Sequence, residues 1–287
     1  MKRIIIHGGC GAREEPNTPF EAYHDNLLPI IKAAHEFLEK SNNAIETALF
    51  TANLLEDNPI FNAGTGSRVQ QDGQIRMSAS YMDSIKNKFS GVINIQNVRY
   101  PSTVAYELHK QHHSILSGEH ASKHAYETLK IMPYNPMTEK RWQEYLELKS
   151  GLTGTIGVVV LDDNGVICAI TSTGGAGSEV PGRVGDSPTV AGNFASSVMG
   201  VSCTGIGEEI VNKAVATKVH TRVKDGMTLE GAVSRSINES DLDGDYVGLI
   251  AIDAAGNIST GTTKIAQTLY AYYDGTNYHT FLEELNK

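Results

Sequence analysis

The sequence predicts an α+β protein in which two mainly antiparallel sheets face each other and helices cover their outer sides, an αββα arrangement. Strand-like and helical segments occur in blocks instead of alternating one by one, which favours antiparallel sheets. Two apolar runs turn back on themselves at DDNG and DAAGN and indicate β-hairpins at residues 155–175 and 246–263. Because their turns are similar, we expect the two hairpins to lie side by side in one sheet.

The first half of the chain is predicted to begin with a short buried strand, KRIIIHGG, that ends at a glycine turn. Helical spacing of apolar residues and glycine-bounded alternating runs predict the elements that follow. In order, these are helices at 20–40, with Pro29 inside, and 44–57, strands within 58–83 and at 90–98, and helices at 102–111 and 118–130. An asparagine before Ala44 is the expected cap of the second helix.

Residues 133–154 are irregular and highly charged and are predicted to form a linker, with an apparent helix in EKRWQEYLELK. The first hairpin follows directly. The remaining predicted elements are a strand at 198–205, helices at 207–226 and 228–239, and the second hairpin. We expect one domain over residues 1–287 because neither a repeat nor a low-complexity segment divides the chain.

Composition excludes several classes of function. The 287 residues are 40% hydrophobic, yet no apolar run is long enough to cross a membrane or to serve as a signal peptide, so we expect a cytoplasmic protein without a membrane partner. The net charge of −9 and the absence of a basic face argue against nucleic acid as a partner. Three isolated cysteines, without metal-ligand spacing, are expected to be small buried hydrophobic residues.

Three threonine-glycine steps occur at the ends of predicted strands. They are Gly154-Thr155, Thr173-Gly174 and Thr204-Gly205. If their strands are neighbours, the hydroxyls and backbone N–H groups converge at one sheet edge and form a polar site. The alternative is that threonine is simply a good strand residue and glycine serves the turns.

A second cluster, PGRVGDSP, presents Arg183 and Asp186 in a frame of proline and glycine. A guanidinium and a carboxylate together match the two charges of an amino acid at its α-carbon. This interpretation competes with a local surface ion pair of little energetic value.

These motifs occur together in a known family. HGGCGA, LEDNPIFNAGTGS, MSASYMD, GTIGVVVLDDNG, TSTGG, PGRVGDSP and SCTGIGE resemble, in order and approximate spacing, the plant-type (type 2) L-asparaginase and isoaspartyl peptidase family of N-terminal nucleophile hydrolases. The resemblance extends from His7 to about Gly261. It implies a precursor that cleaves itself between Gly154 and Thr155 into an α subunit (1–154) and a β subunit (155–287). Thr153 lies in a similar context, but Thr155 leads directly into the apolar strand.

The chemistry of a chain-terminal threonine fits this resemblance, because cleavage exposes an α-amine that serves as the base for the hydroxyl. By resemblance, Thr155 is the nucleophile and Thr173 orients it, while Thr204 and the N–H of Gly205 form the oxyanion hole. Asn62 lies near the nucleophile. Arg183 binds the substrate α-carboxylate, Asp186 binds its α-ammonium, and Gly207 lines the pocket.

The resemblance also implies substrates, ions and partners. The expected substrates are L-asparagine and β-aspartyl dipeptides, hydrolysed without an organic cofactor, and the expected assembly is a dimer of αβ units. A loop around LEDNPIFNAGT resembles one that holds a structural sodium ion. Its ligands would come from Leu55, Glu56, Asn58, Phe61, Ala63 and Thr65.

Two alternatives remain open. One is an N4-(β-N-acetylglucosaminyl)-L-asparaginase, although Gly174 and Ile206 stand where such relatives tend to show other residues. The other is a maturation-defective relative that binds amino acids. The chain also departs from the family at Ser78, usually aspartate, at Ser84, usually glycine, and at Ile206, usually polar.

Overall fold

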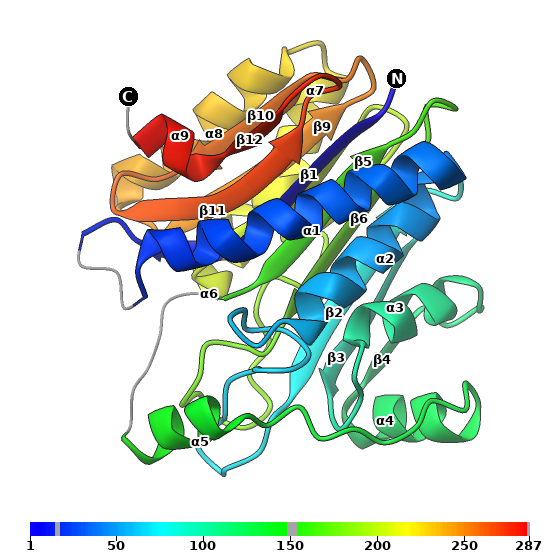
Figure 1. Cartoon of the computed structure of the whole chain (residues 1–287), viewed down its shortest axis with the longest axis vertical. Helices are drawn as coiled ribbons and strands as arrows, with labels where there is room; N and C mark the ends of the chain where they lie inside the picture. The colour runs from blue at the N-terminus through cyan, green and yellow to red at the C-terminus, as the bar shows by residue number, and fades with distance from the viewer. Residues whose placement is uncertain (15–17, 148–153, 286–287) are drawn as a thin grey trace.

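The computed structural model describes residues 1–14, 18–147 and 154–285. It consists of two stacked sheets with helices on both outer faces (Figure 1). This confirms the expected αββα sandwich. Among the described residues, the strands form an eight-stranded and a four-stranded sheet, and every neighbouring pair is antiparallel except β3 and β4. The larger sheet contains, in spatial order, β12 (Tyr278–Thr280), β11 (Ala266–Tyr273), β1 (Arg3–Ala12), β5 (Ile156–Leu161), β6 (Ile167–Thr173), β2 (Met77–Asp83), β3 (Phe89–Ile95) and β4 (Ile115–Ser117).

The smaller sheet faces the middle of the larger one, with β8 and β9 packed on β1, β5 and β6. Its strands, in spatial order, are β10 (Ile258–Thr262), β9 (Val247–Asp253), β8 (Met199–Gly205) and β7 (Asn193–Ala195). The predicted hairpins are both present, as β5–β6 and β9–β10. Our expectation that they share one sheet is wrong, because each belongs to a different sheet. The similar turn sequences encode local hairpins and carry no information about which sheet each hairpin joins.

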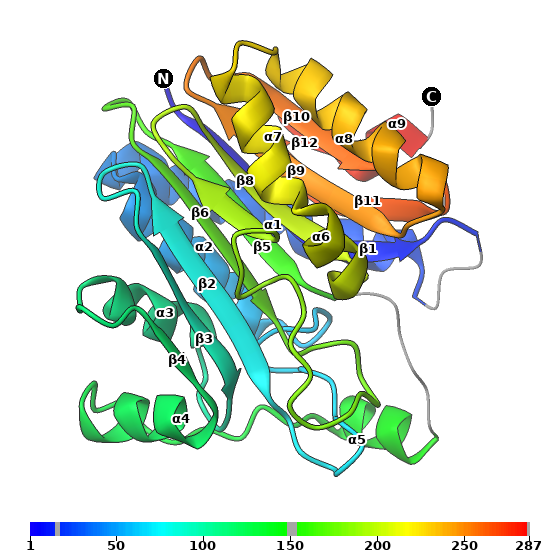
Figure 2. The ribbon, with the colours of Figure 1, turned by 180° about the vertical axis from the view of Figure 1, so that it is seen from behind.

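Helices of the first half cover the outer face of the larger sheet, and helices of the second half cover the smaller sheet (Figures 1 and 2). The first group contains α1 (Phe20–Ser41), α2 (Ala44–Asp57), α3 (Pro101–His109) and α4 (Gly118–Glu127), and α5 (Glu139–Leu146) lies within the linker. The second contains α6 (Gly207–Lys213), α7 (Val215–Lys224) and α8 (Leu229–Asp243), and the short α9 (Phe281–Leu285) packs on β11. No helix in the described part of the chain is both long and apolar enough to cross a membrane.

Local chemistry explains several element boundaries. Asn43 caps α2 as expected, because its side chain accepts the N–H groups of Ile45 and Glu46. The single helix predicted over 207–226 is instead two helices. Ala214 takes a left-handed conformation with φ of 48°, and the N–H of Ala216 bonds to the carbonyl of Ala191 instead of continuing the first helix. A tertiary hydrogen bond therefore overrides the helical periodicity of the sequence.

Each sheet buries its own apolar layer against its helices. The larger core lies between the larger sheet and α1 to α4 and includes Ile250 and Ile252 of β9, and a smaller core fills the space between β8, β9 and α6 to α8. Cys10, Cys168 and Cys203 are all buried and free, as expected. The predicted linker contains α5, as its sequence indicated, whereas residues 148–153, including Thr153, lie outside the described residues.

Candidate active site

Thr155 and Thr173 lie opposite each other at the ends of adjacent strands. The antiparallel pairing of β5 with β6 joins Ile156 to Ser172, which places the preceding Thr155 beside Thr173. The Thr155 hydroxyl donates to the Thr173 hydroxyl over 3.3 Å, and Thr173 Oγ1 also accepts the N–H of Gly175. Both side chains are buried. The hairpin register alone therefore brings two of the three predicted threonines together.

The peptide before Thr155 is enclosed by backbone from two other segments. The carbonyl of Gly154 accepts the N–H of Asn62 at 2.9 Å. A Cβ on Gly154, whose φ is +143°, would lie 2.0 Å from the Cβ of Asn62. On the other side, a Cβ on Gly9 would lie 2.8 Å from the nitrogen of Gly154. Only glycine fits at both positions, so the two glycines allow β1 and the Asn62 loop to approach the Gly154-Thr155 bond.

Asn62 connects this bond to the end of β6. Its carbonyl accepts the N–H of Gly174 at 2.7 Å, and its side-chain amide donates to the carbonyl of Gly175 at 2.6 Å. Its side-chain oxygen accepts the N–H of Arg68 at 2.8 Å. With its polar groups engaged in this way, the buried Asn62 holds Gly154 against the segment that follows Thr173.

Thr204 lies on the other sheet, which corrects our expectation that the three threonines meet at one sheet edge. It belongs to β8 and pairs with Gly248 of β9. Side chains alternate along a strand, so Thr204 shares the face of Ser202, which contacts the larger sheet. Gly205 takes a φ of +133°, and a Cβ there would lie 2.0 Å from the carbonyl oxygen of Tyr246. The third threonine therefore lies on the facing sheet, and its neighbour Gly205 lines the cavity described next.

A cavity of about 100 Å³ opens in front of the Thr155–Thr173 pair. Figure 2 shows α6, which follows β8, close to the start of β5. The cavity lining combines both sheets and the PGRVGDSP loop: Gly154, Thr155, Thr173, Gly175, Ala176, Arg183, Gly185, Asp186, Ser187, Gly205, Ile206, Gly207 and Glu208. A larger cavity of about 640 Å³ lies elsewhere, between α8, β10 and β11, and contains none of the predicted site residues.

Arg183 and Asp186 both line this cavity, but they do not form the local surface pair that we considered. The Arg183 guanidinium binds Glu208 through two bonds, Nε to Oε1 at 2.8 Å and Nη2 to Oε2 at 2.5 Å. Asp186 is buried, and its Oδ2 has no hydrogen-bond partner among the described residues. Burial raises the pKa of Asp186 to about 7, although the Arg183 charge opposes that shift. An unpaired buried carboxylate in a cavity wall is suited to bind a cation.

A buried polar chain, absent from our sequence analysis, lies directly behind Thr155. The N–H of Gly9 donates to Nδ1 of His7, so the ring proton is on Nε2, which lies 3.0 Å from the Ser202 hydroxyl. Ser202 in turn lies 2.7 Å from the Thr171 hydroxyl. Burial lowers the pKa of His7 to about 3, against the opposing hydrogen bond to the Thr155 backbone. The neutral imidazole therefore joins β1 of the larger sheet to Ser202 of the smaller sheet, next to the backbone of Thr155.

The loop predicted to hold sodium offers oxygen donors from its backbone carbonyls and from the Thr65 hydroxyl. The Glu56 carboxylate points away toward Ser102 and Ser172, whose hydroxyls donate to it at 2.6 and 2.7 Å. Burial raises its pKa to about 7 despite these bonds. The carbonyls of Leu55, Glu56, Asn58 and Phe61 each accept one N–H, and the Thr65 hydroxyl lies 2.9 Å from that of Tyr134. Each carbonyl keeps a second lone pair for an ion.

The three departures from the family pattern have local partners. The Ser78 hydroxyl accepts the N–H of Asn94 at 3.1 Å, and the Ser84 hydroxyl accepts the N–H of Ile167 at 2.9 Å. Ile206 lines the cavity and packs against the small cluster of Cys10 and Tyr246. Only Ile206 therefore touches the space available to a ligand.

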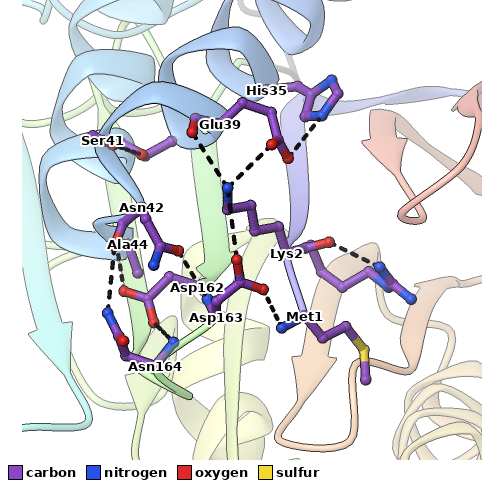
Figure 3. Close-up of polar contacts among 12 residues, drawn as sticks. Met1, Lys2, His35, Glu39, Ser41, Asn42, Ala44, Asp162, Asp163 and Asn164 are labelled. Atoms are coloured by element: carbon purple, nitrogen blue, oxygen red, sulfur yellow. Dashed lines mark hydrogen bonds and ion pairs between the residues drawn. The ribbon is translucent and has the colours of Figure 1, made fainter.

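A polar contact far from the cavity joins the segments before and after Thr155. Figure 3 shows Asp162, in the turn of the β5–β6 hairpin, directed toward the start of α2, where it accepts the N–H of Ala44 at 3.0 Å. Its other oxygen accepts the N–H groups of Asn164 and Val166. The neighbouring Asp163 forms an exposed ion pair with the Met1 amine. These contacts would persist after cleavage at Gly154-Thr155.

Sequence reasoning missed the contributions of Gly8 and Gly9, of His7, Ser202 and Thr171, and of Glu208. A Cβ on Gly8 would lie 2.3 Å from the Phe61 ring, so this glycine fits against the loop that carries Asn62. The adjacent glycines of HGGCGA, which do not match a phosphate-binding pattern, were the only signal of this close packing. The polar chain carries no local signal because its members come from three separate strands.

Comparisons with known proteins find relatives that match nearly the whole chain. A family model described as "Asparaginase" matches residues 1–283. An isoaspartyl peptidase/L-asparaginase from Synechocystis sp. is 41% identical, covering 96% of this chain and 88% of the relative. A plant-type L-asparaginase from Pyrococcus horikoshii is 34% identical, covering 95% and 96%. An isoaspartyl peptidase from Escherichia coli is 32% identical, covering 89% and 88%.

Proposed function

We propose, from the premise that the chain belongs to the asparaginase family, that it hydrolyses the side-chain amide of L-asparagine and the isopeptide bond of β-aspartyl dipeptides. The relatives named above carry these two activities in their names. One observation carries the proposal. The hydroxyl of Thr155, the residue that directly follows Gly154, is hydrogen-bonded to Thr173, and Thr155 lines the same cavity as Arg183 and Asp186.

Self-cleavage between Gly154 and Thr155 is the first proposed step. The Thr155 hydroxyl attacks the carbonyl carbon of Gly154, the C–N bond breaks, and Gly154 becomes an ester of Thr155 Oγ1 while the amine takes up a proton. Water then hydrolyses the ester, giving subunits 1–154 and 155–287. The Asn62 N–H, already bonded to the Gly154 carbonyl, supports this step because it stabilises negative charge on that oxygen.

The new amine of Thr155 then serves as the base for substrate hydrolysis. It accepts the hydroxyl proton as Oγ1 attacks the substrate side-chain carbonyl, and ammonia or an amino acid leaves with a proton. We assign the oxyanion to the Thr204 hydroxyl and the Gly205 N–H, which approach from the facing sheet. Thr173 orients the nucleophile through its hydrogen bond. Water releases aspartate from the threonine ester and regenerates the amine.

The charged groups of the cavity suit the α-carbon end of such a substrate. We propose that Arg183 binds the α-carboxylate and that Asp186 binds the α-ammonium. In this structure the Glu208 carboxylate occupies the Arg183 guanidinium instead of a substrate carboxylate. Gly207 keeps space beside the guanidinium, because a Cβ there would lie 2.8 Å from Arg183 Nη2. Hydrogen bonds to both ends of the zwitterion would select L-asparagine over amides that lack an amino-acid head group.

A sodium ion is proposed for the loop of residues 55–65. Carbonyl and hydroxyl oxygens are the donors that hard cations prefer. We propose as its ligands the carbonyls of Leu55, Glu56, Asn58, Phe61 and Ala63 and the Thr65 hydroxyl. The ion would stiffen the loop that carries Asn62. Its role is structural, so no organic cofactor and no metal-bound reactant enters the proposed reaction.

We further propose a cytoplasmic homodimer of αβ units. The test of the whole proposal is intact mass, N-terminal sequencing and ammonia release from L-asparagine, for the wild type and Thr155→Ala. We expect a new terminus beginning Thr-Ile-Gly in the wild type alone, together with ammonia release. Ligand-induced thermal stabilisation without ammonia release would instead identify an amino-acid-binding protein. Preferential release of N-acetylglucosaminylamine and aspartate from N4-(β-N-acetylglucosaminyl)-L-asparagine would identify a glycosylasparaginase. Ammonia release by Thr155→Ala equal to that of the wild type would refute the assigned nucleophile.

A further inference from the structure

The linker helix α5 is docked on the loop that carries Asn62. Thr138 caps the helix, and Arg141 in its first turn is buried, an unusual position for a charged residue of a linker. Other linker residues reinforce the contact. The Pro136 carbonyl accepts the N–H of Gly66 at 3.0 Å, and Tyr145 donates to the carbonyl of Gln71 at 3.2 Å.

The Arg141 guanidinium bonds to main-chain carbonyls on either side of Asn62. Its Nε donates to the Gly66 carbonyl at 2.6 Å, and its Nη2 donates to the Phe61 carbonyl at 3.4 Å. Its Nη1 donates to Glu144 at 2.7 Å, which compensates the buried charge. The planar guanidinium thereby binds two loop carbonyls and a carboxylate from fixed directions, which a lysine cannot do.

One peptide group connects this cation to the bond proposed to break. The carbonyl of Phe61 and the N–H of Asn62 belong to the same peptide, since the residues are adjacent. Arg141 donates to the oxygen of this peptide, the Phe61 carbonyl, and the N–H of the same peptide, that of Asn62, donates to the Gly154 carbonyl at 2.9 Å. A hydrogen bond to a peptide carbonyl polarises the N–H of that peptide, and chains of such bonds strengthen one another.

We propose that Arg141 is a positioning residue for self-cleavage, which orients and polarises the Phe61–Asn62 peptide so that its N–H stabilises negative charge on the Gly154 oxygen. The inference rests on the proposed self-cleavage. The linker helix therefore connects the two halves of the chain and also contributes the Arg141 guanidinium to cleavage of the Gly154-Thr155 bond.

The test follows cleavage of the full-length chain over time after cell-free synthesis, by denaturing electrophoresis and intact mass. We compare the wild type with Arg141→Gln, Arg141→Lys, Arg141→Gly and Thr155→Ala, and with Lys140→Gln as a matched loss of an exposed charge on the same helix. We expect Arg141→Gln to slow cleavage at least tenfold, Arg141→Lys to remain slow, and Lys140→Gln to match the wild type. Added guanidinium ion at low millimolar concentration should accelerate Arg141→Gly and leave the wild type unchanged.

The outcomes separate the inference from the proposed function. Cleavage of Arg141→Gln at the rate of Lys140→Gln would overturn the inference alone. Slow cleavage that guanidinium does not restore, accompanied by a lowered melting temperature, would assign Arg141 a merely structural role and also overturn it. A wild-type chain that stays intact, like Thr155→Ala, would instead refute self-cleavage itself.

Discussion

The backbone nitrogen of Asn62 lies 2.9 Å from the carbonyl oxygen of Gly154. A Cβ on Gly154 would lie 2.0 Å from the Cβ of Asn62, so there is no space for a side chain on Gly154. Because a methyl group there would displace Asn62, we expect Gly154→Ala to slow self-cleavage by about a hundredfold or more, the scale of a lost oxyanion donor. Electrophoresis of the purified chain over time measures the rate. Gly165→Ala is the matched control, because Gly165 also has a positive φ but no atom lies near its Cβ direction. Equal cleavage in both variants would contradict the assignment.

Thr173 is expected to act through its hydroxyl. Replacing Thr173 by valine removes the acceptor of the 3.3 Å bond from Thr155 while keeping the shape of the side chain. We expect kcat to fall about 10- to 100-fold, equivalent to about 1.4–2.7 kcal/mol of transition-state stabilisation. Thr173→Ser keeps the hydroxyl and should retain most of the activity. The measurement is steady-state ammonia release by cleaved enzyme, and a fully active valine variant would exclude the role.

The raised pKa of Asp186 predicts that ligand binding depends on pH. Its pKa in the ligand-free protein is raised to about 7 by burial, so the carboxyl is neutral at lower pH and loses its attraction for an α-ammonium. The dissociation constant of L-aspartate, the expected product, should therefore rise by about tenfold per pH unit below about pH 7. Calorimetric titration measures it. Asp186→Asn should bind weakly at all these pH values, whereas a pH-independent constant for the wild type would count against Asp186 as the ammonium ligand.

The lowered pKa of His7 predicts that the stability of the folded protein depends on pH. Its pKa is about 3 when folded, against 6.5 for an ordinary histidine, so the unfolded chain binds the extra proton first. The stability that the neutral ring contributes is present above about pH 6.5 and is lost as the pH falls toward 3. His7→Phe lacks this titration and leaves the Gly9 N–H and the Ser202 hydroxyl without the ring, which should cost about 1–3 kcal/mol at neutral pH.

The measurement for His7 is urea unfolding at neutral and mildly acidic pH. We expect the difference in unfolding free energy between wild type and His7→Phe to shrink on acidification, because only the wild type loses stability through this group. A difference that stays constant would show that the imidazole does not titrate between the two states as its burial requires.

Asp162 and Asp163 form a matched pair in the hairpin turn (Figure 3). Asp162 is buried and binds the start of α2, so Asp162→Ala should leave the Ala44 N–H unsatisfied and destabilise the chain by about 1–3 kcal/mol. Asp163 is half exposed and pairs with the chain terminus, so Asp163→Ala should change the stability much less than Asp162→Ala. Thermal unfolding measures both effects. Equal losses would show that the helix contact contributes nothing specific.

Several features followed from the sequence alone because they depend on local chemistry. Periodicity located the helices and hairpins, and Asn43 signalled the cap of α2. The order of motifs indicated the family and thus the sandwich fold. The pairing of Thr155 with Thr173 also follows from the sequence, since a tight hairpin places the residue before one strand opposite the last residue of the next. The roles assigned to these threonines stay predictions.

The tertiary structure alone decided how distant segments meet at the site. Sheet stacking brings Gly205 of the smaller sheet into the wall of the cavity that Thr155 lines, and a tertiary hydrogen bond divides the helix expected at 207–226. The Asn62–Gly154 contact and the binding of the Phe61 carbonyl by Arg141 join residues far apart in the chain. Periodicity and turn chemistry act over a few residues, whereas these contacts depend on the relative placement of sheets and loops. The sequence therefore determined the chemical groups and their local strands, and tertiary packing decided which groups can act together.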